Sequence, residues 1–318
     1  MMFVTANAWA HLGWEWRLPS DKRQQKISLH PRVAGLEKLN ANPWVDARRF
    51  GSTEPGRTTV LLIGDSHAIS LVGLAADLGN RHNIEFTVYT FSGCPPIFGA
   101  HRAYDPMKER PPLQKQEGCK EQVELWEKYI GNTNFDYVML ASRWAWMFEP
   151  EAYGNYTMTR QYLVNNDEPV QSLVDSRRVF REGLRHTAKT IRSLGSKVII
   201  LSQVPHTGKP VGACLDVPRY LFTSSMMDRR CQAMDKSVAL ERLEFTNMVI
   251  RRLGEMKGVE TVIPSDYFCE TDYCRAISEG ETLYKDVTHL SVRGSIWLGK
   301  RIEQDGVLSL VEKKKETD

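Results

Sequence analysis

Residues 59–63 read Thr-Val-Leu-Leu-Ile and are followed directly by Gly64. A strand without alternation of apolar and polar residues is covered on both faces, as the strands of parallel sheets are. Beyond the glycine, apolar residues recur at helical spacing as far as residue 78. This succession of strand, turn and helix predicts an α/β fold.

The same alternation continues along the chain. Further strands are expected at residues 84–90, 137–141, 197–202 and 259–263. Helices are expected at residues 119–130 and 170–194, over about 25 residues ending near residue 256, and at residues 289–302. Strands that alternate with helices form parallel sheets with right-handed crossovers. We therefore expect a three-layer α/β/α domain around a central parallel sheet of about five strands.

The chain divides into an N-terminal extension, residues 1–55, and a globular domain, residues 56–318. The extension shows little regular pattern and is rich in tryptophan. It fits either an arm packed on the domain or a linker beside a membrane, since tryptophan favours the membrane interface. Within the domain, a Pro-rich loop is expected at residues 92–118. A polar and aromatic insertion at residues 147–169 is expected to lie over the surface.

Six cysteines fall in loop-like segments: Cys94, Cys119, Cys214, Cys231, Cys269 and Cys274. An even number of cysteines in such segments indicates disulfides and an oxidising compartment. The sequence does not fix their pairing. The local choice is Cys94–Cys119, Cys214–Cys231 and Cys269–Cys274, in which each pair brackets one connection. Free thiols and zinc are the alternatives, but the chain has no Cys-x-x-Cys and no histidine at ligand spacing, so we expect no metal.

Charge and hydropathy argue against several classes. The net charge is +3 and the basic residues are scattered apart from residues 313–315, which argues against nucleic-acid binding. No stretch approaches the roughly 20 apolar residues of a membrane-spanning helix. Residues 1–20 lack the basic start and apolar run of a secretory signal. Taken alone this favours the cytosol, whereas disulfides without a signal imply that the chain is part of something longer.

A serine, a histidine and an aspartate stand where such a fold can bring them together. Ser66 follows the first strand, and Asp286 and His289 precede the last helix. A serine hydroxyl needs a base within reach, histidine suits that role, and an aspartate holds the ring in the required tautomer. The three residues predict an acyl-transfer site. Taken separately, Asp65 or Ser66 could instead cap the first helix, and Asp286 the last.

Other candidate site residues lie directly after the expected strands. In parallel sheets, sites lie at the carboxyl ends of the strands. Ser66, Gly93, Arg143 and Pro205 each fall in a loop just past an expected strand. We expect these four residues to lie along one edge of the sheet.

Two motifs resemble a known family. Gly-Asp-Ser-His at residues 64–67 and Asp-Val-Thr-His at residues 286–289 resemble the SGNH (GDSL-type) hydrolase superfamily, which has a flavodoxin-like fold. Residues 92–96, 141–144 and 283–291 are similar to a narrower group. This group comprises the periplasmic SGNH domains fused behind acyltransferase-3 membrane proteins, which O-acetylate bacterial O-antigens and other surface polysaccharides.

The resemblance implies a role for each matching residue. Ser66 matches the nucleophile, Asp286 the orienting acid and His289 the base. Gly93 matches a glycine whose backbone N–H joins that of Ser66 in an oxyanion hole, the donor set that stabilises the transition-state oxyanion. No cofactor is implied.

The third block departs from the superfamily pattern, because Ala-Ser-Arg-Trp at residues 141–144 replaces Gly-x-Asn-Asp. Arg143 could donate to the oxyanion, or hold an acceptor sugar with Trp144 as a stacking face. Alternatively, Arg143 could pair with a buried carboxylate such as Asp65, which is a purely structural role.

The leading hypothesis is an O-acyltransferase that carries the acyl group, above all acetyl, on Ser66 between an acyl donor and a glycan acceptor. The resemblance implies a periplasmic domain of an inner-membrane protein that works with a membrane acyltransferase domain. Water in place of the sugar would make the protein a carbohydrate O-acetyl esterase. A glycan-binding or assembly module without chemistry is the third hypothesis, and the aromatic residues between 144 and 162 would suit it.

Overall fold

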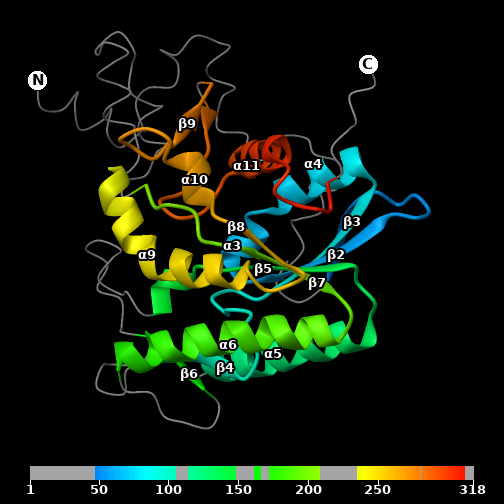
Figure 1. The fold of residues 1–318 in the computed structure, drawn as a ribbon, viewed down its shortest axis with the longest axis vertical. Helices are drawn as coiled ribbons and strands as arrows, with labels where there is room; N and C mark the ends of the chain where they lie inside the picture. Colours follow the sequence, from blue (N-terminus) through cyan, green and yellow to red (C-terminus); the bar gives the residue numbers. More distant parts are fainter. Residues whose placement is uncertain are drawn as a thin grey trace, which may run out of the picture.

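The computed structural model describes residues 47–104, 114–147, 161–165, 172–207, 235–279 and 281–311. A six-stranded sheet lies at its centre, between two layers of helices (Figure 1). The predicted three-layer α/β/α architecture is confirmed. Residues 1–46, which make up most of the expected N-terminal extension, lie outside the described residues, so the packed-arm and linker interpretations stay predictions.

The strands of the sheet lie in the order β1-β3-β2-β5-β7-β8. Their bounds are Arg48–Gly51 for β1, Thr58–Gly64 for β2, Ile84–Thr90 for β3, Tyr137–Ala141 for β5, Lys197–Leu201 for β7 and Val259–Val262 for β8. All neighbours from β3 to β8 are parallel. In chain order these five strands lie 2-1-3-4-5, the flavodoxin-like arrangement.

The sequence prediction missed β1, which pairs antiparallel with β3 at the edge of the sheet. It falls inside the segment that we expected to be irregular. Its sequence, Arg-Arg-Phe-Gly, is short and carries a single apolar residue, Phe50, which is buried. An edge strand of this kind has no periodicity long enough to reveal it.

Strand β2 explains why the first apolar run shows no alternation. Val60 and Leu62 belong to the core on one face of the sheet, and Leu61 and Ile63 to the core on the other. All four side chains are fully buried. The strand therefore needs apolar residues at every position, as expected for a strand with helices on both sides.

Helices on both faces complete these two cores (Figure 1). The face of Val60 is covered by α4 (Val72–His82) and α11 (Val292–Asp305). The opposite face is covered by α5 (Gln114–Asn132), α6 (Leu173–Ser193) and α9 (Lys236–Leu253). Shorter elements are α3 (Ser66–Ile69), η3 (Trp144–Met147), α10 (Pro264–Phe268), β9 (Ile277–Ser278) and β10 (Glu281–Thr282).

Helices α4 and α11 approach each other closely. A Cβ atom on Gly73 would lie 2.4 Å from Ser295 Oγ, so only glycine fits there. The Leu74 N–H donates to the same Ser295 Oγ over 3.1 Å. The first long helix and the last helix are thus joined side by side.

A second, two-stranded sheet joins parts of two segments that we expected to be irregular. β4 (Ala100–Tyr104) pairs antiparallel with β6 (Gln161–Asn165). The expectation that all of residues 147–169 lie over the surface is wrong, because Tyr162, Leu163 and Val164 are buried. These three apolar side chains join the core beneath α6 rather than facing solvent.

The described residues contain two disulfides, Cys94–Cys119 and Cys269–Cys274. Both match the predicted local pairing. Cys214 and Cys231 lie outside the described residues, so their pairing stays a prediction. Among the helices that the structure describes, none is long and apolar enough to cross a membrane.

Candidate active site

The turn after β2 presents Ser66 at the carboxyl-terminal edge of the sheet. Gly64 ends the strand with φ +147°, and a Cβ atom there would lie only 1.7 Å from the Ala141 carbonyl oxygen. No other residue fits this position without moving β5. Ser66 follows as the first residue of α3. The glycine thus lets the chain turn sharply beside the neighbouring strand and brings Ser66 to the edge.

Asp65 fastens this turn to the loop after β5. Its buried carboxylate accepts hydrogen bonds from the His67 N–H (2.8 Å), the Ser142 hydroxyl (2.6 Å) and the Arg143 N–H (2.9 Å). Burial raises the pKa of Asp65, against the lowering effect of these donors. Asp65 is therefore the residue that caps the first helix, and the Ser66 hydroxyl is available for another role. The Arg143 N–H thus bonds to Asp65, the carboxylate named in the prediction of a structural role for Arg143.

The structure brings Ser66, His289 and Asp286 into one hydrogen-bonded chain. His289 Nε2 lies 2.7 Å from Ser66 Oγ, and His289 Nδ1 lies 2.8 Å from Asp286 Oδ2. A carboxylate can only accept, so Nδ1 carries the proton and Nε2 accepts from the serine hydroxyl. This tautomer can take the serine proton as the hydroxyl attacks an acyl carbon.

Asp286 closes the turn that carries His289. Its Oδ1 accepts from the N–H groups of Thr288 and His289, each over 2.8 Å. Burial alone would raise the pKa of Asp286, but the hydrogen bonds from the His289 ring and from these two N–H groups outweigh it and lower that pKa below its usual range. The carboxylate therefore stays charged and can orient the imidazole.

The start of the last helix differs from the prediction. Helix α11 begins at Val292 rather than His289, because the Ser291 side chain accepts from the Gly294 N–H and caps it. Asp286 therefore does not cap this helix, and the alternative interpretation of its motif is wrong. Asp286 and His289 instead occupy a separate turn ahead of the helix.

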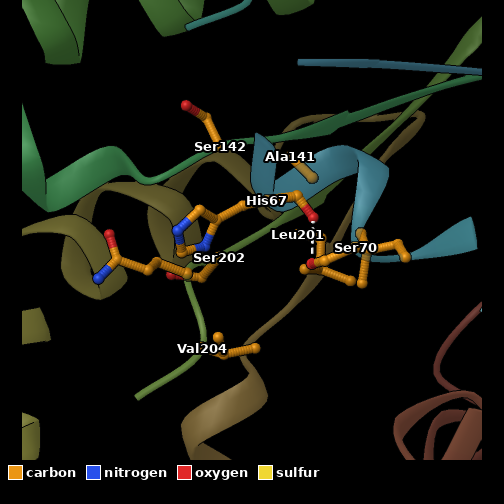
Figure 2. A pocket seen from close by; sticks show the side chains of 9 residues that line it. His67, Ser70, Ala141, Ser142, Leu201, Ser202 and Val204 are labelled. Atoms are coloured by element: carbon orange, nitrogen blue, oxygen red, sulfur yellow. Dashed lines mark hydrogen bonds between the residues drawn. The ribbon is translucent and has the colours of Figure 1, made fainter. Parts of the chain in front are cut away.

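Two buried histidines, His67 and His206, lie near the three hydrogen-bonded residues and have lowered pKa values. The His67 ring lies 4.7 Å from the His289 ring, centre to centre, and its side chain extends into a small cavity (Figure 2). Burial and the charges of His289 and Arg143 lower the pKa of His67 well below its usual value. Burial and Arg143 do the same for His206. His206 lies in the loop after β7 and is also buried, with its Nε2 3.2 Å from Gln203 Nε2.

The cavity of Figure 2 lies between α3 and the ends of β5 and β7. It is lined by His67, Ser70, Leu71, Ala141, Ser142, Leu201, Ser202, Gln203 and Val204. Ser66 and Asp286 are not among these residues, so the cavity is not the space in which an acyl group would meet the serine. No cluster of three metal-binding side chains occurs in the part of the chain that the structure describes.

The predicted substrate contact of Trp144 is wrong. Its side chain is fully buried against Phe180, and its indole N–H donates to the Leu201 carbonyl over 2.9 Å. A side chain that serves the core cannot offer a face to a sugar. Trp146, two residues further on, is only partly buried, and the Arg143 guanidinium lies over it with Cζ 5.0 Å from the ring centre. The sequence alone did not single out Trp146.

Gly93 lies in a turn that contacts the turn of Gly64 and Ser66 directly. The Phe91 N–H donates to the Gly64 carbonyl over 2.9 Å, and the Cys94 N–H closes the turn on the Phe91 carbonyl. Gly93 has φ +69°, a conformation that favours glycine. The loops that carry Ser66, Gly93 and Arg143 thus meet at one edge of the sheet, whereas the oxyanion role of Gly93 stays a prediction.

The fold and this edge define a class of protein: a flavodoxin-like α/β domain with a serine, a histidine and an aspartate joined by hydrogen bonds at the carboxyl ends of its parallel strands. The family model for the SGNH domain fused to AT3 domains matches residues 34–304, and the chain belongs to this family.

Comparison with a solved acetyltransferase domain agrees on the fold. The periplasmic domain of the Salmonella ser. Paratyphi A lipopolysaccharide acetyltransferase superposes with a TM-score of 0.52 at 16% identity, over 80% of this chain and 85% of that one. The acetyl xylan esterase AlAXEase superposes with a TM-score of 0.40 at 13% identity, over 79% of this chain and 100% of that one. No curated protein matches the sequence.

Proposed function

We propose that the protein is an O-acyltransferase that carries an acetyl group on Ser66 and passes it to a hydroxyl of a bacterial surface glycan. The observation that carries this proposal is the 2.7 Å contact between Ser66 Oγ and His289 Nε2, with Asp286 on the other ring nitrogen. Membership of a family fused to AT3 membrane domains supports transfer as the reaction.

The first half-reaction forms the acyl-serine. His289 Nε2 takes the hydroxyl proton while Ser66 Oγ attacks the carbonyl carbon of the acyl donor. In the tetrahedral intermediate the N–H groups of Ser66 and Gly93 donate to the oxyanion. The bond to the leaving group then breaks, and His289 returns the proton to that group. Asp286 stabilises the imidazolium between these two proton transfers.

The second half-reaction repeats the same steps with the glycan hydroxyl. His289 takes the proton of this hydroxyl, whose oxygen attacks the acyl carbon on Ser66. Collapse of the intermediate breaks the bond to Ser66 Oγ, which receives the proton from His289. The product is an ester on the sugar and the free serine, so protons and bonds balance without a cofactor.

We further propose that the domain works in the periplasm beside a membrane acyltransferase domain that delivers the acyl group. The two disulfides support an oxidising compartment. The structurally similar Salmonella protein is itself described as a periplasmic domain of an acetyltransferase. Fusion to AT3 domains across the family supports the membrane partner.

The test is to incubate the purified chain with p-nitrophenyl acetate, with and without candidate polysaccharides, and to follow the acetyl group by mass spectrometry. Ser66→Ala is the decisive variant. Ser193→Ala is its matched control, because Ser193 is exposed at the end of α6 and bonds only to its own helix.

The possible outcomes distinguish a transferase, an esterase and a binding module. Acetylated sugar that depends on Ser66 supports the transferase. Acetate release without acetylated sugar identifies an esterase that uses the same three residues with water. Sugar binding without an acyl-serine identifies a binding module. Transfer that persists in Ser66→Ala overturns both enzymatic functions.

A further inference from the structure

The turn of residues 91–94 is held from two sides. On one side, Cys94 is bonded to Cys119 of α5. On the other side lies the Arg102 guanidinium, which occupies the space where a side chain at Gly93 would stand. A Cβ atom on Gly93 would lie 2.7 Å from Arg102 Nη1 and 3.2 Å from Nη2. The glycine and the guanidinium are therefore in direct contact.

Arg102 is an unusual residue for this position. The residue is only 5% exposed, although arginine is rarely so deeply buried. Its backbone belongs to β4, where it stands opposite Leu163 of β6. The small second sheet thus fixes the base of the side chain, and the guanidinium reaches from there to the Gly93 turn.

The same guanidinium also contacts the third loop. Arg102 Cζ lies 5.0 Å from the centre of the Trp146 ring, the distance of a cation–π contact. The Arg143 guanidinium lies over that ring at the same distance. Arg102 therefore joins the loop of Gly93 to the loop of Arg143 and Trp146. Neither the motifs of the sequence nor the proposed mechanism uses this residue.

We propose that Arg102 is a positioning residue, which fixes the Gly93 peptide so that its N–H faces the oxyanion of the acyl-serine reaction. The inference rests on the proposed function. A glycine turn can adopt several conformations, and the guanidinium excludes those that would move the peptide toward β4. A displacement of about 1 Å in a catalytic group can lower a rate by about 100-fold.

The direct test replaces Arg102 by Met, which keeps the stem and removes the guanidinium. We expect kcat for Ser66-dependent acetyl release to fall 10- to 100-fold while KM changes less than threefold, because the ground state makes little use of the oxyanion donors. Arg102→Lys, which keeps the charge but loses the planar group, is expected to recover little. Arg251→Met is the control, since Arg251 pairs with Asp266 at the surface.

A second readout excludes a merely structural role. Methylboronic acid adds to a reactive serine as a tetrahedral anion, so its affinity reports the oxyanion donors directly. We expect Arg102→Met to weaken this adduct by the same factor as kcat, measured on the folded fraction. An unchanged boronate affinity with a lower melting temperature would show that Arg102 serves stability alone. If Arg102→Met does not fold, Arg102→Lys decides by the same two measurements.

Gly93→Ala completes the test through its clash with the guanidinium. The alanine should reduce kcat more in the wild-type background than beside Arg102→Met, where its Cβ has room and only the cost of positive φ remains. Additive effects overturn the proposed contact. A Ser66→Ala variant that remains active would overturn the proposed function, whatever the result for Arg102. Ser66-dependent turnover with Arg102→Met within threefold of wild type overturns the positioning role alone.

Discussion

Replacing Asp286 by Asn tests whether this carboxylate orients His289, the proposed base, because the change exchanges a single oxygen for nitrogen. An asparagine side chain can keep its Oδ1 on the N–H groups of Thr288 and His289, which Asp286 Oδ1 now accepts over 2.8 Å. Its amide nitrogen then takes the place of Oδ2 and presents N–H donors to His289 Nδ1. Two donors cannot face each other, so the ring proton moves to Nε2. The ring then points a donor at Ser66 and cannot take its proton.

We expect this change to lower kcat by about 10³- to 10⁴-fold, or roughly 4 to 5.5 kcal/mol in the activation free energy. The stability of the fold should change far less. The Asp286 side chain is 47% exposed, so the lost charge-assisted contact contributes only about 1 kcal/mol to the free energy of unfolding. A large loss of rate with a small loss of stability is the signature of a wrong tautomer rather than of a broken site.

The assay is acetyl release from p-nitrophenyl acetate, with kcat and KM measured separately and unfolding followed by circular dichroism. Asp266→Asn is the matched control, because Asp266 pairs with Arg251 at the surface. A kcat within tenfold of wild type, still dependent on Ser66, would show that Asp286 does not orient the base.

Two further predictions concern the buried side chains around the site. His67 and His206 have lowered pKa values in the fold, so the unfolded chain binds more protons than the folded one below about pH 6.5. The free energy of unfolding should therefore fall as the pH falls from 7 to 5.5, by at most about 1.4 kcal/mol per pH unit for each histidine; urea denaturation that shows no such fall would contradict their neutral state. Trp144→Phe should lower the free energy of unfolding by about 1–3 kcal/mol, through the lost indole hydrogen bond and core volume. The KM for a glycan acceptor should stay unchanged, and a raised KM in the folded variant would restore Trp144 as a substrate contact.

Much of the fold follows from local pattern. Strands β2, β5 and β7 are largely buried on both faces, so their apolar runs predict them. The Ser66 turn follows from Gly64, since few sequences can turn so sharply beside a neighbouring strand. The edge strand at residues 48–51 and the pairing of β4 with β6 depend on partners distant in the chain. Short segments carry too few residues for a period to reveal such contacts.

In the candidate site, too, some residues can be predicted from local pattern and others depend on contacts distant in the chain. The sequence motifs singled out Ser66, Asp286 and His289 because residue type and order are enough to suggest their chemistry. Trp144 and Trp146 differ by two positions in a single 3₁₀ turn, and no pattern says which of them faces the core. Arg102 stands in a segment without regular pattern, and only the pairing of β4 with β6 brings it to Gly93. The sequence therefore predicts the reacting groups better than the residues that hold them.

The close packing of α4 against α11 has a consequence for the proposed acyl-transfer reaction. Ser66 lies just ahead of α4, and its base lies just ahead of α11, 223 residues later. The two meet only when the last helix docks on the first long one, through the contact of Ser295 with Leu74. In the proposed mechanism Ser66 therefore has no base until the last helix is in place. The proposed acyl transfer then depends on folding of the complete domain, from the turn after β2 to α11.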